Sequence, residues 1–242
     1  MPEALRNSIE FKLWGRYALF TDPLTKVGGE KCSYHVPTYE ALKGVAKSIY
    51  WKPTLIWVID EVRVMKRIRT QTKGTKPMEF SGGNSLAIYT FLADVEYQVR
   101  AHFEWNEQRA ELKADRTEGK HFAVARRMLE RGGRQDIFLG TRDCQGYVQP
   151  CPFGSGRSEL DSTGELGYGL MFHGFDYPDE QGGGDLHARF WWPTMVDGVI
   201  RFTRPEGCAN RKFVRSMAVK RFGLGENQLD VDAQAVALGV AP

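Results

Sequence analysis

The strongest constraint on the fold is an alternating pattern over residues 89–105. Its odd positions carry Tyr, Phe, Ala, Val, Tyr, Val, Ala, Phe and Trp, and its even positions carry Thr, Leu, Asp, Glu, Gln, Arg, His and Glu. Successive side chains of a strand point to opposite faces, so the pattern predicts one long strand with an apolar face and a wet face. Such a strand is typical of an antiparallel sheet that covers a core on one side. His102 falls on the wet face, where we interpret it as an exposed histidine rather than a metal ligand.

Two further segments precede this strand. Residues 9–20 alternate in a similar way and predict a first strand. Thr38 is a suitable N-cap for a helix that extends to about Trp51. Tyr50 lies at the end of that helix, and Pro53 stops it.

The next segments continue the alternation of strands and helices. Residues 54–69 predict a long strand, which would place Arg63, Arg67 and Arg69 on one face. Residues 70–84 predict a polar loop. A second helix begins near residues 117–120 and ends at residue 131, and residues 136–140 begin another strand.

The resulting order is strand, helix, strand, strand, helix, strand, which predicts an α+β protein with a ferredoxin-like N-terminal domain. From residue 146 the composition shifts to Gly, Asp and aromatics, and short strands are predicted at 169–174, 186–192 and 199–202. We therefore predict a ferredoxin-like domain at residues 1–145, a small antiparallel β unit at 146–222 and a poorly ordered tail at 223–242.

Composition excludes several classes of protein. Hydrophobic residues make up 42% and charged residues 26% of the 242 residues, which is ordinary for a globular chain. No apolar run is long enough to span a membrane, and residues 1–10 lack the apolar segment of a secretory signal. The four cysteines form no CxxC pair. We expect a cytoplasmic protein with no membrane contact, no metal site and no cofactor.

Basic residues concentrate in the first part of the chain. Residues 43–76 hold nine Lys/Arg against two Asp/Glu, whereas residues 143–210 hold four against ten. This asymmetry fits a polyanion-binding face, although charge alone does not separate it from an ordinary solvated surface. The candidate RNA-binding residues are Lys43, Lys47, Arg63, Arg67, Arg69 and Arg126.

Lys120 and His121 stand side by side at the start of the second helix. A helix N-terminus attracts anions, lysine supplies a positive charge, and histidine acts as an acid or a base near neutral pH. The plainer interpretation is a polar helix start with His121 packed beside Ala125, and these residues alone favour it.

The sequence contains no phosphate-binding loop, no HExxH, no GxSxG and no cluster of metal ligands. Nuclease chemistry, if present, should therefore proceed without a metal. RNA permits this, because its own 2′-OH attacks the adjacent phosphate once a base removes the proton. A cation must stabilise the charge that develops on the phosphate, and an acid must protonate the departing 5′ oxygen.

Seven segments together resemble one family. They are YALFTDPLT at 17–25, YEALKG at 39–44, SIYWKP at 48–53, EGKH at 118–121, DIFLG at 136–140, CQGYV at 144–148 and HGFDYP at 173–178. These motifs are similar to those of the type I-C (Dvulg subtype) CRISPR-associated Cas proteins that process repeat RNA, within the RAMP superfamily. The resemblance spans about residues 8–210.

The resemblance implies a ferredoxin-like domain plus a small β-sheet unit. It implies metal-independent cleavage of precursor CRISPR RNA at the base of the repeat hairpin, leaving a 2′,3′-cyclic phosphate. It also implies that the protein stays on the crRNA 5′ handle, together with other Cas subunits of a surveillance complex. The family's catalytic tyrosine matches Tyr50, and its lysine–histidine pair matches Lys120 and His121.

Several alternatives stay open at this stage. A non-catalytic scaffold that binds the crRNA handle would keep the same fold while another protein cuts the RNA. A generic RNA-recognition module would bind without regard to the repeat hairpin. Whether DNA is also bound or cut, and how acid and base roles divide among Tyr50, Lys120 and His121, does not follow from the sequence.

Overall fold

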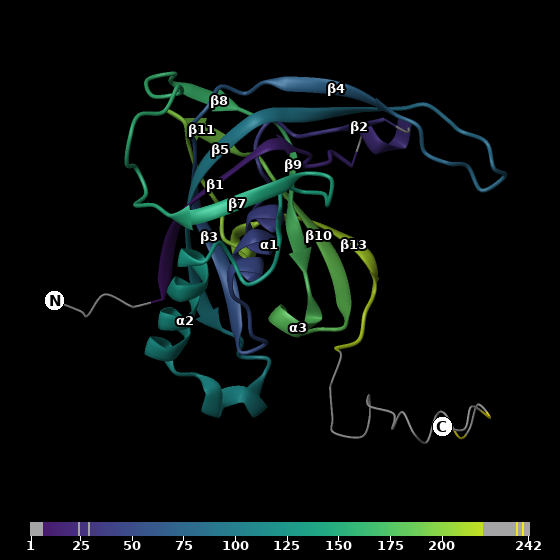
Figure 1. The fold of residues 1–242 in the computed structure, drawn as a ribbon. Helices are drawn as coiled ribbons and strands as arrows, with labels where there is room; N and C mark the ends of the chain where they lie inside the picture. Colours follow the sequence, from purple (N-terminus) through teal and green to yellow (C-terminus); the bar gives the residue numbers. More distant parts are fainter. Residues whose placement is uncertain (1–6, 24, 29, 220–235, 237–238, 240–242) are drawn as a thin grey trace.

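The structure is a computed structural model that describes residues 7–23, 25–28, 30–219, 236 and 239. These residues form one large, mostly antiparallel sheet, a smaller three-stranded sheet and a few helices (Figure 1). The predicted α+β class is therefore confirmed. The predicted C-terminal tail, residues 223–242, lies outside the described residues except for positions 236 and 239.

Two sheets organise the described chain. Neighbouring strands of the large sheet follow the order β6 (Ile137–Phe138), β7 (Gln145–Pro150), β1 (Ser8–Ala18), β5 (Ala87–Trp105), β3 (Leu55–Val64), β12 (Val199–Arg201), β11 (Thr194–Val196) and β8 (Glu165–Gly167). Two more strands, β2 (Lys31–Cys32) and β4 (Thr70–Thr75), also pair with β5. The smaller sheet has the order β13 (Asn210–Ser216), β10 (Asp185–Trp191) and β9 (Met171–Asp176).

The helices are short and few. The α-helices are α1 (Tyr39–Ile49), α2 (Glu118–Glu130) and α3 (Pro178–Gln181). The 3-10 helices are η1 (Thr25–Gly28), η2 (Ala110–Asp115) and η3 (Pro205–Gly207). Helix α1 contacts β3 and β9, whereas α2 contacts β1 and β7. The two longest α-helices thus lie against the central strands of the large sheet and beside each other.

Strand β5 is the centre of the large sheet, as its alternating pattern predicts. It pairs antiparallel with β1 on one side and with β3 on the other. Tyr97 lies opposite Leu13 on β1 and Val64 on β3, and its side chain is buried. His102 is a correction, because it is half-buried rather than exposed: its ring contacts Asp60 at 2.9 Å and Glu104 at 3.3 Å.

Helix α1 begins and ends where the sequence predicts. The Thr38 side chain accepts a hydrogen bond from the backbone N–H of Ala41, which caps the first turn. Leu42 and Ile49 lie on its buried face. Tyr50 is the C-terminal cap residue, and its backbone N–H donates to the Ala46 carbonyl at 3.0 Å.

The region after β3 differs from the prediction. Strand β3 ends at Val64, so Arg67 and Arg69 lie outside it and do not share a strand face with Arg63. Residues Thr70–Thr75, predicted as loop, form β4 and pair with the N-terminal part of β5. The reason is the length of β5: its backbone groups beyond β3 need hydrogen-bond partners, and β4 supplies them.

The later part of the chain contributes to both sheets. The predicted domain boundary after residue 145 falls at the first residue of β7, a strand that pairs with β1. The strand predicted to begin at residues 136–140 is shorter than expected, because β6 contains only two residues. The strand predicted at 199–202 appears as β12 and pairs with the edge of β3. The strands predicted near 169–174 and 186–192 appear as β9 and β10 in the smaller sheet. Local periodicity reveals such strands but not their pairing partners.

Candidate active site

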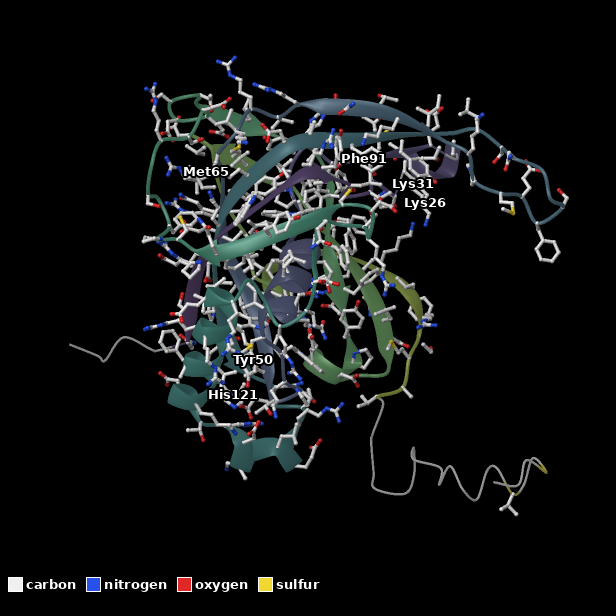
Figure 2. The ribbon with its side chains drawn as sticks, in the orientation of Figure 1. Lys26, Lys31, Tyr50, Met65, Phe91 and His121 are labelled. Atoms are coloured by element: carbon white, nitrogen blue, oxygen red, sulfur yellow. The ribbon has the colours of Figure 1, made fainter. Side chains whose placement is uncertain are left out.

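The C-terminal end of α1 and the first turn of α2 bring Tyr50 and His121 together. The Tyr50 hydroxyl oxygen lies 2.8 Å from His121 Nδ1, although the residues are 71 positions apart. Figure 2 shows the two side chains next to each other, far from Met65 at the opposite end of β3. The sequence places both residues at helix ends, and the sheet brings those ends into contact.

Tyr50 is held by backbone contacts on both sides of its peptide unit. Its N–H belongs to the last turn of α1, and its carbonyl accepts a hydrogen bond of 2.7 Å from the indole Nε1 of Trp57 on β3. Only 3% of Tyr50 is exposed. These contacts determine the direction in which the phenol ring leaves the helix.

His121 is buried and its ring nitrogens have distinct partners. Nε2 lies 2.7 Å from the backbone carbonyl oxygen of Asp115. A carbonyl only accepts, so Nε2 carries a hydrogen, and Nδ1 of the neutral ring then accepts from the Tyr50 hydroxyl. The rings of Phe103 and Trp105 meet the imidazole edge-on. The tautomer therefore leaves Nδ1 as the basic nitrogen, facing Tyr50.

Asp115, at the end of η2, connects the histidine to the lysine. Its carboxylate forms an ion pair with Lys120 and accepts a hydrogen bond of 2.9 Å from the Thr54 hydroxyl. These two donors hold the pKa of Asp115 below its usual range. The same ion pair raises the pKa of Lys120 above its ordinary value. Lys120 is therefore a permanent cation, and 51% of its side chain is exposed.

The Tyr50 hydroxyl is a proton donor at neutral pH. Burial raises the pKa of Tyr50 above its ordinary value, and the Asp115 carboxylate raises it further. The cations of Lys120 and Arg134 act in the opposite direction on this pKa. The site thus combines a protonated phenol, an imidazole lone pair and a half-exposed cation, which are groups for moving a proton beside a developing negative charge.

Two of the predicted RNA-binding lysines face inward. Lys43 is 2% exposed and forms an ion pair with Glu180 of α3, and Lys47 contacts the same carboxylate at 2.8 Å. The two lysines do lie on one face of α1, as the spacing predicts. In this structure, however, their charges are used to attach α3 to α1.

Arg63 also faces inward. It is 8% exposed, contacts Asp161 at 2.8 Å and donates to the Gly156 carbonyl at 3.2 Å. It holds the segment after β7 against β3, rather than standing on an open strand face.

The other three predicted RNA-binding residues are on the surface. Arg67 and Arg69 line a shallow cavity with Arg157, beyond the end of β3 that lies away from Tyr50. Arg126 is on α2 and contacts Glu130 at 3.2 Å. Arg67 also pairs with Glu159 at 3.9 Å, so a polyanion would reach these exposed cations in competition with nearby glutamates, and their role stays a prediction.

Three neighbours of the site were not identified from the sequence. Asp115 contacts Lys120 and His121, five and six positions further along the chain, and Thr54 reaches Asp115 from 61 positions away, which leaves no local pattern. Arg134 stands near Tyr50, because its backbone N–H donates to the Ser48 carbonyl at 3.0 Å. The one available signal for Arg134 was its place in a basic segment of the sequence.

The described residues contain neither a metal-ligand cluster nor a helix that could span a membrane. No group of three or more His, Cys, Asp or Glu side chains is placed to hold a metal ion there. Within the same residues, no helix has the length and apolar character needed to span a membrane.

Comparisons with known proteins give consistent results. A model of the Cas5d family, described as CRISPR-associated protein (Cas5), matches residues 8–203. The chain therefore belongs to the Cas5d family of CRISPR-associated proteins. This confirms the prediction of a type I-C protein of the RAMP superfamily.

Individual relatives cover most of the chain. The protein named CRISPR pre-crRNA endoribonuclease Cas5d of Mannheimia succiniciproducens is 29% identical over 226 residues, covering 81% of this chain and 95% of that protein. A crystal structure described as a CRISPR-associated protein has 33% identity and a TM-score of 0.73, covering 85% and 96% of the two chains. A functionally uncharacterised protein from Streptococcus mutans, SMU1763c, has 36% identity and a TM-score of 0.71 at the same coverage.

Proposed function

We propose that this protein is a metal-independent endoribonuclease that cleaves precursor CRISPR RNA at the base of the repeat hairpin. The observation that carries the proposal is the hydrogen bond between the Tyr50 hydroxyl and His121 Nδ1, beside the exposed cation of Lys120. The curated relative named as a pre-crRNA endoribonuclease supports the same reaction.

The proposed reaction is an attack by the ribose 2′-OH on the adjacent phosphate. The O2′–P bond forms, the P–O5′ bond breaks, and the products carry a 2′,3′-cyclic phosphate and a 5′-OH. His121 is 0% exposed and its Nδ1 faces the Tyr50 hydroxyl, so the ribose reaches this nitrogen only through that hydroxyl. Tyr50 therefore takes the proton of the 2′-OH while passing its own proton to His121 Nδ1. The same relay, run in reverse, returns a proton to the departing 5′ oxygen.

Lys120 stabilises the negative charge that develops on the phosphate. In the structure its ammonium is bound to Asp115. Because half of the Lys120 side chain is exposed, the ammonium can turn from this carboxylate to the phosphate without any change in the fold. Asp115 continues to orient His121 through its backbone carbonyl.

The fold and the assembly are part of the same proposal. The antiparallel order β7–β1–β5–β3, with α1 between β1 and β3 and α2 between β5 and β7, supports a ferredoxin-like arrangement of the N-terminal domain. After cleavage the protein remains on the crRNA 5′ handle as a subunit of a type I-C surveillance complex with other Cas proteins. Its membership of the Cas5d family supports this role.

The test is incubation of the purified protein with the repeat RNA encoded beside its gene, in the presence of EDTA. The native protein should cut at the base of the hairpin and leave a cyclic phosphate. His121→Ala should abolish cleavage, and the control variant His187→Ala, on β10, should not. A substrate with 2′-deoxyribose at the scissile nucleotide should resist cutting.

Two results would contradict the proposal. Undiminished cleavage by His121→Ala would remove the proposed base. Tight binding of the hairpin by the native protein without any cleavage would favour the alternative of a non-catalytic scaffold that holds the crRNA handle.

A further inference from the structure

An exposed tryptophan follows directly after the proposed catalytic tyrosine. Trp51 is 44% exposed, although large aromatic side chains usually bury most of their surface. The chain on its N-terminal side is fixed by the two backbone hydrogen bonds of Tyr50, and Pro53 restricts the chain on the other side. The indole is thus held at the surface beside the proposed active site by a constrained backbone.

Trp51 lines two surface cavities that differ in the charged residues of their walls. One cavity, of about 610 Å³, is lined by Lys47, Trp51, Lys52, Pro53, Arg134 and Gln135. The other, of about 430 Å³, has the carboxylates of Glu111, Asp179 and Glu180 in its lining, together with the cations of Lys47 and Arg109. Lys47 lines both cavities and is paired with Glu180, so Lys52 and Arg134 are the cations that distinguish the first cavity, whose wall contains no carboxylate. A polyanion that passes Trp51 would therefore favour the first cavity over the second.

The cationic wall is attached to the end of α1. The backbone N–H groups of Arg134 and Gln135 each donate to the Ser48 carbonyl at 3.0 Å. Both Arg134 and Lys52 are exposed, and neither side chain forms an ion pair with another described residue. Burial and the Asp115 carboxylate raise the pKa of Tyr50, and the positive charge of Arg134 acts in the opposite direction on this pKa.

We propose that Trp51, Lys52 and Arg134 form the subsite for the nucleotide next to the scissile phosphate. The base of this nucleotide stacks on the Trp51 indole, and its phosphate contacts Lys52 and Arg134. Stacking on an aromatic side chain accepts any base, and an arginine fork suits a phosphate. The cavity has a volume within the usual range for small ligands, roughly 300–1,000 Å³.

This subsite would complete the geometry of the site. The proposed relay of Tyr50 and His121 is buried and has little surface of its own with which to orient RNA. Because Trp51 follows Tyr50 directly in the chain, a base held on the Trp51 indole would keep the neighbouring nucleotide beside the proposed active site. Trp51 is thus a positioning residue for the reaction. The inference rests on the proposed function, because it takes RNA as the substrate.

The test measures stacking separately from cleavage. The repeat hairpin carries 2′-deoxyribose at the scissile nucleotide, which blocks the reaction, and 2-aminopurine on one side or the other of the scissile phosphate. Stacking on Trp51 should quench 2-aminopurine fluorescence at one of these two positions when the native protein binds. Trp51→Ala should abolish the quenching, and Trp51→Phe should retain part of it.

The effects on binding and cleavage should follow the same order. Trp51→Ala should raise the RNA concentration for half-maximal single-turnover cleavage about 5- to 150-fold, the range expected for one lost base stack. Trp51→Phe should recover most of this loss. Arg134→Gln and Lys52→Gln should each reduce the magnitude of the slope of log affinity against log salt concentration by about one, the change expected when one phosphate contact is lost. The control is Trp192→Ala, which removes another exposed tryptophan, 62% exposed, on the segment after β10.

The outcomes separate this inference from the proposed function. If Trp51→Ala quenches 2-aminopurine as the native protein does, or if Trp192→Ala has the same effect as Trp51→Ala, the subsite is wrong while the nuclease proposal stands. If the native protein leaves the all-ribose hairpin uncut, the nuclease proposal fails. The fluorescence measurement then still decides whether RNA stacks on Trp51.

Discussion

Helix α1 carries a tyrosine at each end, and each tyrosine lies against a buried histidine. At the C-terminal end, Tyr50 makes a hydrogen bond of 2.8 Å to His121. At the N-terminal end, Tyr39 stacks on His173 with ring centroids 4.2 Å apart. Both histidines are 0% exposed. The same pair of residue types is therefore placed twice in one molecule, in similar burial.

The two imidazoles differ in the group that faces Nδ1. In both rings Nε2 lies near a backbone carbonyl, that of Asp115 at 2.7 Å and that of Thr203 at 2.8 Å. Nδ1 of His121 faces a phenol, whereas Nδ1 of His173 accepts from Arg189 at 3.4 Å. A phenol can pass a proton to the ring and take another from a substrate. A guanidinium keeps its protons at any ordinary pH, so the second ring has no route for a proton.

The neighbouring lysines differ in the same way. Lys120 is half-exposed and its partner Asp115 is itself a quarter exposed, so an RNA phosphate can reach the ammonium. Lys43 is buried with Glu180 between α1 and α3. We infer that burial of a Tyr–His pair does not distinguish a catalytic site from a packing site. The distinguishing features are a hydroxyl that can exchange its proton with Nδ1 and a cation at the surface.

The largest expected effect separates the two tyrosine hydroxyls. Tyr50→Phe removes the proposed relay to His121 and should lower the cleavage rate roughly 10²- to 10⁴-fold. Tyr39→Phe keeps the stacked ring on His173, and its effect on cleavage per folded molecule should be negligible. Single-turnover cleavage of the repeat hairpin measures both. Equal rates for the two variants would show that the hydroxyl on Nδ1 is not the relevant difference.

The second comparison replaces each of the two lysines, Lys120 and Lys43, by glutamine. Lys120→Gln removes the cation beside the proposed scissile phosphate and should lower the cleavage rate about 10²-fold, with the melting temperature unchanged. Lys43→Gln leaves Glu180 with only Lys47 and should lower the free energy of unfolding by about 3 kcal/mol. Cleavage assays and urea unfolding separate the effects. A stable Lys43→Gln protein with weakened RNA binding would instead support the sequence-based prediction that Lys43 contacts RNA.

How far the sequence predicts this arrangement depends on the range of the contact. The ends of α1 and α2 follow from a cap residue and local periodicity, so Tyr50 and Lys120 could be placed at helix ends. That the ends meet depends on the register of β1, β5 and β3, which no local pattern contains. The resemblance to a known family was the only signal that grouped Tyr50 with Lys120 and His121.

The errors have the same origin. The ion pair of Lys43 with Glu180 joins residues 137 positions apart, and that of Arg63 with Asp161 joins residues 98 apart. From sequence, such cations look like members of a basic surface, because their partners Glu180 and Asp161 lie in a distant acidic segment. Counting charges over a segment indicates the asymmetry of the chain but not which charges remain free.

The third prediction concerns the pH dependence of stability at the packing site. Burial, together with the charge of Arg189, lowers the pKa of His173 to about 3, while the backbone carbonyl of Thr203 and the carboxylate of Asp176 act in the opposite direction. The unfolded chain binds a proton at this residue below about pH 6.5, whereas the folded protein excludes it. Stability should therefore fall as the pH decreases from about 6.5 toward 3.

At pH 5 this histidine alone should cost about 2 kcal/mol of unfolding free energy relative to pH 7. The measurement is urea unfolding of the native protein and of His173→Gln at both pH values. The variant is expected to be less stable at pH 7 but to lose about 2 kcal/mol less between the two pH values. Equal losses would mean that His173 titrates normally, and the difference between the two imidazole sites would need another explanation.

The smallest expected effect tests whether the surface near the catalytic end of α2 contacts RNA. Arg126 is 68% exposed and its pair with Glu130 is a solvent-exposed i,i+4 contact, so Arg126→Gln should change the unfolding free energy by less than about 0.5 kcal/mol. If Arg126 contacts a phosphate, the substitution should reduce the magnitude of the slope of log affinity against log salt concentration by about one, the change expected for one lost phosphate contact. Arg201→Gln is the matched control, because Arg201 is 85% exposed and likewise pairs with a glutamate, Glu61 at 2.9 Å. The same loss of slope in both variants would indicate a diffuse attraction to the whole molecule, whereas a loss confined to Arg126→Gln would place the RNA along α2, next to Lys120.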